Sequence, residues 1–218
     1  MLRTGLPILL EVPKVYAVVL SSYDWKGAFD RLDPTKVAVK LINMGIRSSI
    51  VRILIDFLND RKMQLKMNQK QSSVLDLIGG GPQGSLIGQL LYIIGSDDVA
   101  EEVIEEDKFK YVDDLSTFEA LIDKQNLIEY DFSQHVASDI EVGQHFITPS
   151  TFKTQETNNQ ISRWTEENNM KLNCSKSNYM IVTNVKEDIA TRLFLDRNLL
   201  KKEKVIYHLG LWIAEDLT

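Results

Sequence analysis

The stretch YVDDLSTF, Tyr111 to Phe118, places two aspartates side by side between two short apolar runs. FKYV before the pair and LSTF after it have the composition of strands, so the sequence predicts a hairpin with Asp113 and Asp114 at its turn. Neighbouring carboxylates repel each other, and two-residue turns favour Asn-Gly or Asp-Gly, so this pair is a strained choice. Two interpretations follow: a plain polar turn, or a site for a doubly positive ion.

The composition is that of a globular protein, and we predict that residues 1–218 form one domain. No apolar run reaches the roughly 20 residues of a membrane helix, and the N-terminus does not have the pattern of a signal peptide. The single Cys174 cannot form an internal disulfide, which favours a reducing compartment. We therefore expect a cytoplasmic or nuclear protein with no membrane partner.

Charge is unevenly distributed along the chain. The net charge of −6 argues mildly against a nucleic-acid partner, because phosphates attract Lys and Arg. Between Arg31 and Lys70, however, nine basic residues stand against three acidic ones. Residues 97–107 carry seven acidic residues and no basic one, and we interpret them as a solvated helix face. The basic block is either another solvated face or a track for phosphates.

Several further elements are predicted from local pattern. VYAVVL, Val15 to Leu20, reads as a buried strand that ends at SSYD, so Asp24 comes just past it. A helix begins at Pro34 with Asp33 as its N-cap, and ends at Gly45. Its predicted buried face is Val37, Leu41 and Ile42. The remaining expected elements are a helix over residues 47–60 capped by Ser48 or Ser49, a hairpin over 61–79, polar helices over 119–169 divided at Thr148-Pro149, and strands at 177–183 and 205–214.

The stretch GGGPQGSLIGQLLYIIG, residues 79–95, begins as a glycine loop and becomes an apolar helix near Ser85. Three glycines allow the backbone to approach a ligand closely, and a helix start offers free N–H groups. The alternative is an ordinary junction between a loop and a helix.

Three carboxylates, Asp24, Asp113 and Asp114, are thus predicted at strand ends or turns. If the first strand lies beside the hairpin, Asp24 faces the hairpin turn, and the cluster needs a counter-charge. Oxygen ligands of this kind suit Mg²⁺. No competing site is apparent, because Cys174 has no base partner and the three histidines lack the spacing of metal ligands (His135, His145 and His208).

Five segments in order resemble the motifs of reverse transcriptases, RNA-directed DNA polymerases, of the non-LTR (LINE-like) retrotransposon type. The segments are SYDWKGAFD (22–30), GGPQGSLIG (80–88), YVDD (111–114), NMKLNCSKSNYMIV (169–182) and HLGLWI (208–213). The resemblance implies an α+β polymerase palm, in which helices back an antiparallel sheet that carries the carboxylates. It also implies that deoxynucleotides are added to a DNA primer 3′-OH on an RNA template, with two Mg²⁺ ions, which Mn²⁺ can replace.

The resemblance also implies roles for single residues. Asp24 and Asp113 match the principal metal ligands, and Asp114 matches the supporting carboxylate. Lys176 matches a lysine that can act as general acid for the leaving pyrophosphate, or it is a surface lysine. Four further residues match nucleotide- or primer-contacting positions: Phe29, as a steric gate that selects dNTPs or else an ordinary core residue, Gln83, Gly84, and Tyr111, which an ordinary strand tyrosine would also explain.

The chain departs from the family pattern in some places. Gln89 stands where the family usually has proline, and Gly27 where it often has lysine. Fingers and thumb are expected to be largely absent, so we predict a truncated fragment of a longer polymerase that would hold primer and template weakly. The alternatives are an RNA-dependent RNA polymerase relative, which Phe29 argues against, and an inactive remnant that binds RNA or protein.

Overall fold

The structure is a computed structural model, and it describes residues 17–77, 79–103, 107–121, 146–147, 153–183, 190–208 and 210–216. The chain divides into two compact units. We call Met1–Asp24, Glu102–Ser162 and Leu172–Thr218 the sheet unit, and Trp25–Glu101 with Arg163–Lys171 the helical unit. Each is described separately, and the single domain predicted from the sequence stays a prediction.

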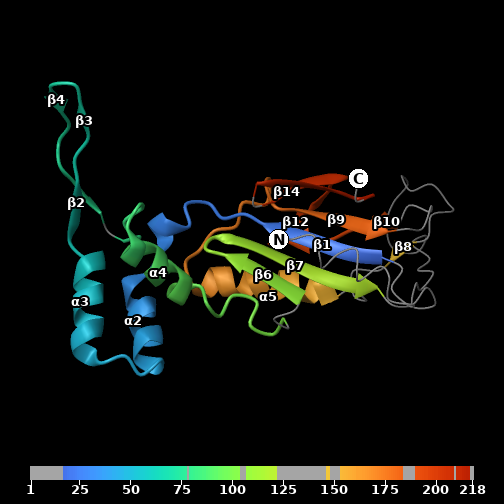
Figure 1. The fold of residues 1–218 in the computed structure, drawn as a ribbon, viewed down its shortest axis with the longest axis horizontal. Coiled ribbons are helices and arrows are strands. Elements are labelled where there is room, and N and C mark those ends of the chain that lie inside the picture. The colour runs from blue at the N-terminus through green and yellow to red at the C-terminus, as the bar shows by residue number, and fades with distance from the viewer. Residues whose placement is uncertain are drawn as a thin grey trace. The chain divides into compact units, whose positions relative to one another are not determined.

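The sheet unit is built on five strands in the order β13-β9-β1-β7-β6. Strands β9, β1, β7 and β6 are labelled in Figure 1. Within this sheet the central strand β1 is antiparallel to both neighbours, β6 is antiparallel to β7, and β13 runs parallel to β9. The strands are β1 Ala17–Tyr23, β6 Lys108–Tyr111, β7 Asp114–Leu121, β9 Asn178–Thr183 and β13 Lys201–Lys202. A mixed α and β fold with a mainly antiparallel sheet is therefore confirmed.

The two faces of this sheet bury different side chains, because neighbouring residues of a strand point to opposite sides. On one face Leu20, Met180 and Val182 form an apolar cluster with Ile206. Ile206 belongs to the hairpin of β14 Val205–His208 and β15 Leu211–Ala214, which lies where the sequence predicted strands at 205–214. On the other face the Tyr23 hydroxyl donates to Asn158 Oδ1 of helix α5 at 2.8 Å.

Helix α5, Lys153–Glu167, confirms one of the predicted polar helices. The prediction was wrong at residues 119–121, which continue strand β7, because pairing with β1 outweighs their polar composition. The predicted boundary at Thr148-Pro149 lies outside the described residues. Two short strand pairs complete this part of the chain: β8 Phe146–Ile147 with β10 Ala190–Thr191, and β11 Phe194–Leu195 with β12 Asn198–Leu199.

In the helical unit, α2 Pro34–Asn43 begins as the sequence predicted, since Asp33 accepts a hydrogen bond from the Thr35 N–H. The prediction of its buried face was wrong for Ile42, which is 57% exposed. Helix α3, Ser48–Leu58, has Arg47 at its N-cap without a side-chain hydrogen bond, so neither predicted serine caps it. This unit also contains the short 3-10 turn η1 Phe29–Arg31 and helix α4 Leu86–Gly95, which begins after Ser85 as expected and has Ser85 as its N-cap.

The predicted hairpin over residues 61–79 is present in the helical unit (Figure 1). Its outer rungs pair β3 Lys66–Met67 with β4 Lys70–Gln71, and its inner rungs pair β2 Arg61–Met63 with β5 Leu75–Leu77. Among the described residues, no helix is long and apolar enough to cross a membrane.

The acidic segment that follows α4 is not the predicted helix face. Its described residues 97–103 form turns and a bend. Asp98 accepts from the Lys40 ammonium at 2.5 Å and from the Trp164 indole N–H at 2.7 Å. Burial opposes ionisation, but these hydrogen bonds outweigh it and lower the pKa of the Asp98 carboxyl. At least one charge of this block is therefore part of the packing of the helical unit.

Candidate active site

Asp24 and Asp114 meet at one end of the sheet. Tyr23, the last residue of β1, is paired with Leu115 of β7. Asp24 follows Tyr23 and Asp114 precedes Leu115, so the antiparallel register puts the two aspartates at the same level of neighbouring strands. The predicted proximity of Asp24 to the hairpin is confirmed.

The hairpin turn is shifted by one residue from the prediction. Tyr111 pairs with Asp114, so the two turn residues are Val112 and Asp113. Val112 has a φ of 55°, in the left-handed region that a β-branched residue rarely adopts. Such a conformation costs on the order of 1–3 kcal/mol, which the surrounding pairing must offset. Asp113 is exposed in the turn, whereas Asp114 is the first residue of β7.

Asp24 is held by the segment that precedes β9. The Asn173 side-chain amide donates to Asp24 Oδ2 at 2.6 Å, and the Asn173 backbone N–H donates to the Asp24 carbonyl at 2.8 Å. The Asp24 N–H donates to Ser177 Oγ at 3.0 Å. These contacts fix both the backbone and the carboxylate of Asp24. Both residues belong to the motif NMKLNCSKSNYMIV, but the motif alone indicates no role for Asn173 or Ser177.

Negative charge dominates the electrostatics of the cluster. Burial is the main cause that raises the pKa of Asp114, and the charges of Asp113 and Asp24 raise it further, while His208 partly opposes the rise. A cation near these side chains would relieve that repulsion, and carboxylate oxygens are the donors that Mg²⁺ prefers. The carboxylate oxygens of Asp24, Asp113 and Asp114 are therefore chemically suitable ligands for a magnesium ion. Among the described residues, however, no three His, Cys, Asp or Glu side chains are already grouped around a common metal position.

His208 is a neighbour of this cluster that the sequence reasoning left on the surface or in the core. It ends β14, is half-buried, and has its ring nitrogens 3.4 and 3.5 Å from the Ser116 hydroxyl. Burial lowers the pKa of His208, and the Asp114 carboxylate partly offsets that effect. The sequence signal for a role of His208 is its place in the motif HLGLWI, where it is a polar residue at the end of an apolar strand.

Two other predicted residues of the sheet unit are exposed. Tyr111, the last residue of β6, is 64% exposed beside the turn. Lys176 lies in the turn that connects Asn173 with β9, and its backbone N–H donates to the Asn173 carbonyl at 2.9 Å. Its side chain is exposed, so its ammonium is accessible to a ligand in solution.

The remaining predicted residues, Phe29, Gln83 and Gly84, belong to the helical unit. The Phe29 ring is half-buried and stacks on Tyr92 of α4, with 4.8 Å between ring centroids. Gln83 is exposed, and its side-chain amide is 3.4 Å from Asp30 Oδ1. Gly84 is exposed with a φ of 81°.

The glycine loop approaches the protein's own backbone. Gly80 N–H donates to the Leu32 carbonyl at 3.0 Å, and Gly81 N–H donates to the Phe29 carbonyl at 2.6 Å. Arg61 donates to the carbonyls of Gly79 and Gly80 at 2.8 and 2.5 Å. The sequence predicted glycines that permit a close approach, and the structure shows that the 3-10 turn carrying Phe29 is what they approach.

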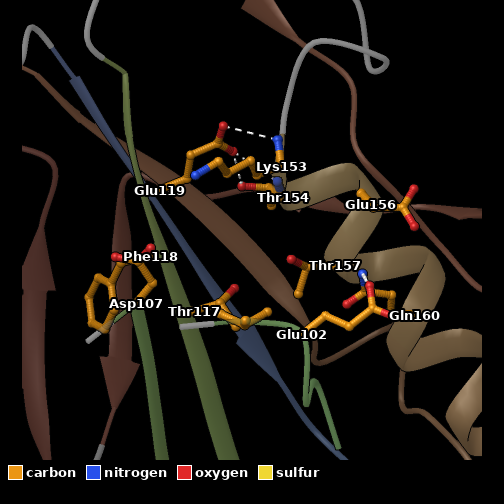
Figure 2. Close-up of a pocket in the computed structure, with 11 residues that line it drawn as sticks. Glu102, Asp107, Thr117, Phe118, Glu119, Lys153, Thr154, Glu156, Thr157 and Gln160 are labelled. Carbon is orange, nitrogen blue, oxygen red and sulfur yellow. Dashed lines mark hydrogen bonds between the residues drawn. The ribbon is translucent and has the colours of Figure 1, made fainter. Parts of the chain in front are cut away.

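A hollow of about 200 Å³ lies elsewhere in the sheet unit, between β7 and the start of α5. Figure 2 shows the residues that line it. Glu119 lies at its edge and accepts from the backbone N–H groups of Lys153 and Thr154 at 3.0 and 2.8 Å, which satisfies the start of α5. Thr117 and Glu119 point to the Tyr23 face of the sheet, whereas Ser116 points to the His208 face. The hollow is therefore separate from the aspartates.

The comparisons with known proteins concern the fold. No protein-family model and no curated protein matches the sequence. A solved structure of apo telomerase from Candida Tropicalis, truncated from its C-terminal domain, matches with a TM-score of 0.57 and 12% identity. The match covers 95% of this chain and 36% of that one. The chain shares its fold with part of telomerase. It spans about a third of that telomerase chain, and the likeness supports a reverse-transcriptase-like fold without distinguishing a non-LTR type.

Proposed function

We propose that the sheet unit is the palm of an RNA-directed DNA polymerase of the non-LTR type. The observation that carries the proposal is the placement of Asp24 at the same level as Asp114, beside the turn that presents Asp113. The motif order in the sequence and the shared fold with part of telomerase support it. An RNA template, a DNA primer and dNTPs are the proposed partners.

In this proposal residues of the sheet unit bind the metal ions, contact the primer and donate a proton to the leaving group. Asp24, Asp113 and Asp114 would hold two Mg²⁺ ions, which when bound supply the positive charge that stabilises the attacking and leaving oxygens of nucleotidyl transfer. Lys176, whose ammonium is exposed, would give a proton to the leaving pyrophosphate. Tyr111, exposed at the end of β6, would contact the primer end.

The residues of the helical unit would select the nucleotide. Phe29 would exclude a ribose 2′-OH, and its stacking on Tyr92 would hold the ring in one orientation. Gln83 and Gly84 would contact the incoming nucleotide and the template. Removing the ring in Phe29→Val is expected to raise incorporation of rNTPs relative to dNTPs, and an unchanged ratio would leave Phe29 as a packing residue only.

A primer-extension assay with an RNA template, Mg²⁺ and either dNTPs or rNTPs tests the proposal. Extension with dNTPs that Asp113→Asn abolishes supports it, provided that circular dichroism shows the variant to be folded. Extension with rNTPs alone would instead indicate an RNA-dependent RNA polymerase, and RNA binding without extension would indicate a binding module. Normal extension by Asp113→Asn would show that the assignment of Asp113 is wrong.

A further inference from the structure

We propose that Asn173 is a positioning residue for Asp24, which fixes the carboxylate in the orientation that metal binding requires. The inference rests on the proposed function, because it concerns the same cluster of aspartates. It assigns Asn173 a role that acts through Asp24.

The contact is short and partly buried. Asn173 is only 9% exposed, and its amide nitrogen lies 2.6 Å from Asp24 Oδ2. A hydrogen bond to an ionised carboxylate is roughly twice as strong as one between neutral groups. In addition, the backbone contact from Asn173 to the Asp24 carbonyl anchors the same two residues to each other. The backbone contact therefore keeps the Asn173 side chain within reach of the Asp24 carboxylate.

The orientation of the Asn173 amide is fixed from its other end. Ser175 Oγ donates to Asn173 Oδ1 at 2.8 Å. An ionised carboxylate can only accept hydrogen bonds, so the NH₂ group must face Asp24 and the carbonyl oxygen must face Ser175. The chain of contacts runs from Ser175 through Asn173 to Asp24, and each donor meets an acceptor.

This arrangement leaves one oxygen of Asp24 available. Asn173 contacts Oδ2, and Oδ1 has no hydrogen-bond partner among the residues that the structure describes. Asp24 follows the last residue of β1, so sheet pairing alone does not set its side-chain rotamer. A neighbour that orients a metal-ligating carboxylate commonly changes metal affinity 10- to 100-fold when it is removed.

The test measures Mn²⁺ binding by electron paramagnetic resonance on the full chain. Asn173→Ala is expected to weaken Mn²⁺ binding about 10-fold or more. The matched control is Asn178→Ala, because that amide donates to the Lys176 carbonyl, in the same segment. Its Mn²⁺ affinity is expected to equal that of the wild type. In primer extension, Asn173→Ala is expected to need more Mg²⁺ for half-maximal rate and to recover at high Mg²⁺.

A second variant tests the same contact with less risk of unfolding the protein. Ser175 is exposed, so Ser175→Ala releases the far end of the Asn173 amide with little change in packing, and it is expected to weaken Mn²⁺ binding several-fold. Wild-type affinity in both variants, with circular dichroism showing intact folds, would overturn the proposal. Asn173-dependent Mn²⁺ binding without any wild-type extension would retain the positioning role and reject the polymerase. Absence of Mn²⁺ binding by the wild type would reject both.

Discussion

Asp24 and Asp114 stand at the same level of two neighbouring antiparallel strands, at the end of the sheet beside the turn formed by Val112 and Asp113. Like charges placed opposite each other on adjacent strands destabilise a sheet. The pair is therefore unfavourable in the isolated protein, and its retention is understandable if a cation is bound during function. Stability and metal binding can be measured separately at this position.

Asp114→Asn is expected to raise the free energy of unfolding, measured with urea in a chelator, by about 0.5 kcal/mol. The gain is small because Asp114 is largely exposed and water screens its charge. Magnesium is expected to raise the Tm of the wild type more than that of the variant, because a ligand that binds the native state stabilises it and the variant has lost one of the three carboxylates. Asp56→Asn, on the exposed side of α3, is the control for charge alone. A wild-type Tm that does not respond to Mg²⁺ or Mn²⁺ would contradict the metal site.

Gly80→Ala is expected to destabilise the protein by about 3 kcal/mol, from an unfavourable φ together with overpacking. Gly80 has a φ of 85°, and a Cβ there would lie 2.8 Å from the Asp30 Cα and 2.9 Å from the Phe29 carbonyl oxygen. The measurement is urea denaturation. Gly45→Ala is the matched control, because its φ of 77° is similar and nothing lies within 4 Å of its Cβ. The free energy of unfolding of the control is expected to fall by only about 1 kcal/mol. Equal losses in the two variants would show that the backbone around Phe29 and Asp30 can move to accommodate a Cβ at position 80.

Features that depend on neighbouring residues could be predicted from the sequence. The N-cap Asp33 and the start of α4 after Ser85 were predicted correctly, because capping is set by residues two or three positions apart. The hairpin was predicted as well, but its turn was placed at Asp113-Asp114. The composition predicts that two strands exist. Their register is decided by the pairing of β7 with β1, and a local sequence pattern carries no information about that pairing.

Features that depend on distant residues could not be predicted. Asn173 contacts Asp24 across 149 positions, and nothing in the local sequence specifies that contact. Ile42 fits the apolar pattern of α2 and is nevertheless exposed, because periodicity defines an apolar stripe and the packing partners decide its width. The proximity of Asp24 to the hairpin was predictable only from the resemblance to polymerases, since two strands far apart in sequence need not be neighbours.

Asp98→Asn is expected to lower the free energy of unfolding by about 1 kcal/mol at neutral pH, by weakening the charged contacts with Lys40 and Trp164. The folded pKa of Asp98 is lowered, so its contribution is present above the unfolded value of 3.8 and is lost as the pH falls below it. The difference between wild type and variant should therefore be constant from pH 5 to 7 and shrink below pH 3.8. The control is Asp76→Asn, which removes an exposed ion pair in which Asp76 Oδ1 lies 3.7 Å from Lys62 Nζ. This variant should show no such pH-dependent difference in stability from the wild type.

Tyr23→Phe is expected to lower the free energy of unfolding by about 1–3 kcal/mol, because a buried acceptor loses its donor. The Tyr23 hydroxyl donates to Asn158 Oδ1 at 2.8 Å and lies 3.1 Å from Thr117 Oγ1. Asn158 Nδ2 has no hydrogen-bond partner among the residues that the structure describes, so the variant would also leave Asn158 Oδ1 without its tyrosine donor. Tyr207→Phe, at an exposed position on β14, is the control and should change stability little.

The wild type and Tyr23→Phe are also expected to differ in how their stability depends on pH in the alkaline range. Burial raises the pKa of Tyr23 to about 12, more than its hydrogen bonds lower it. A raised pKa in the folded state gives stability that is present below pH 10 and lost as the pH rises toward 12, because the unfolded tyrosine ionises first. The wild type should therefore lose stability more steeply than Tyr23→Phe over that interval in urea titrations. Parallel losses in the two proteins would contradict the burial of this hydroxyl between β7 and α5.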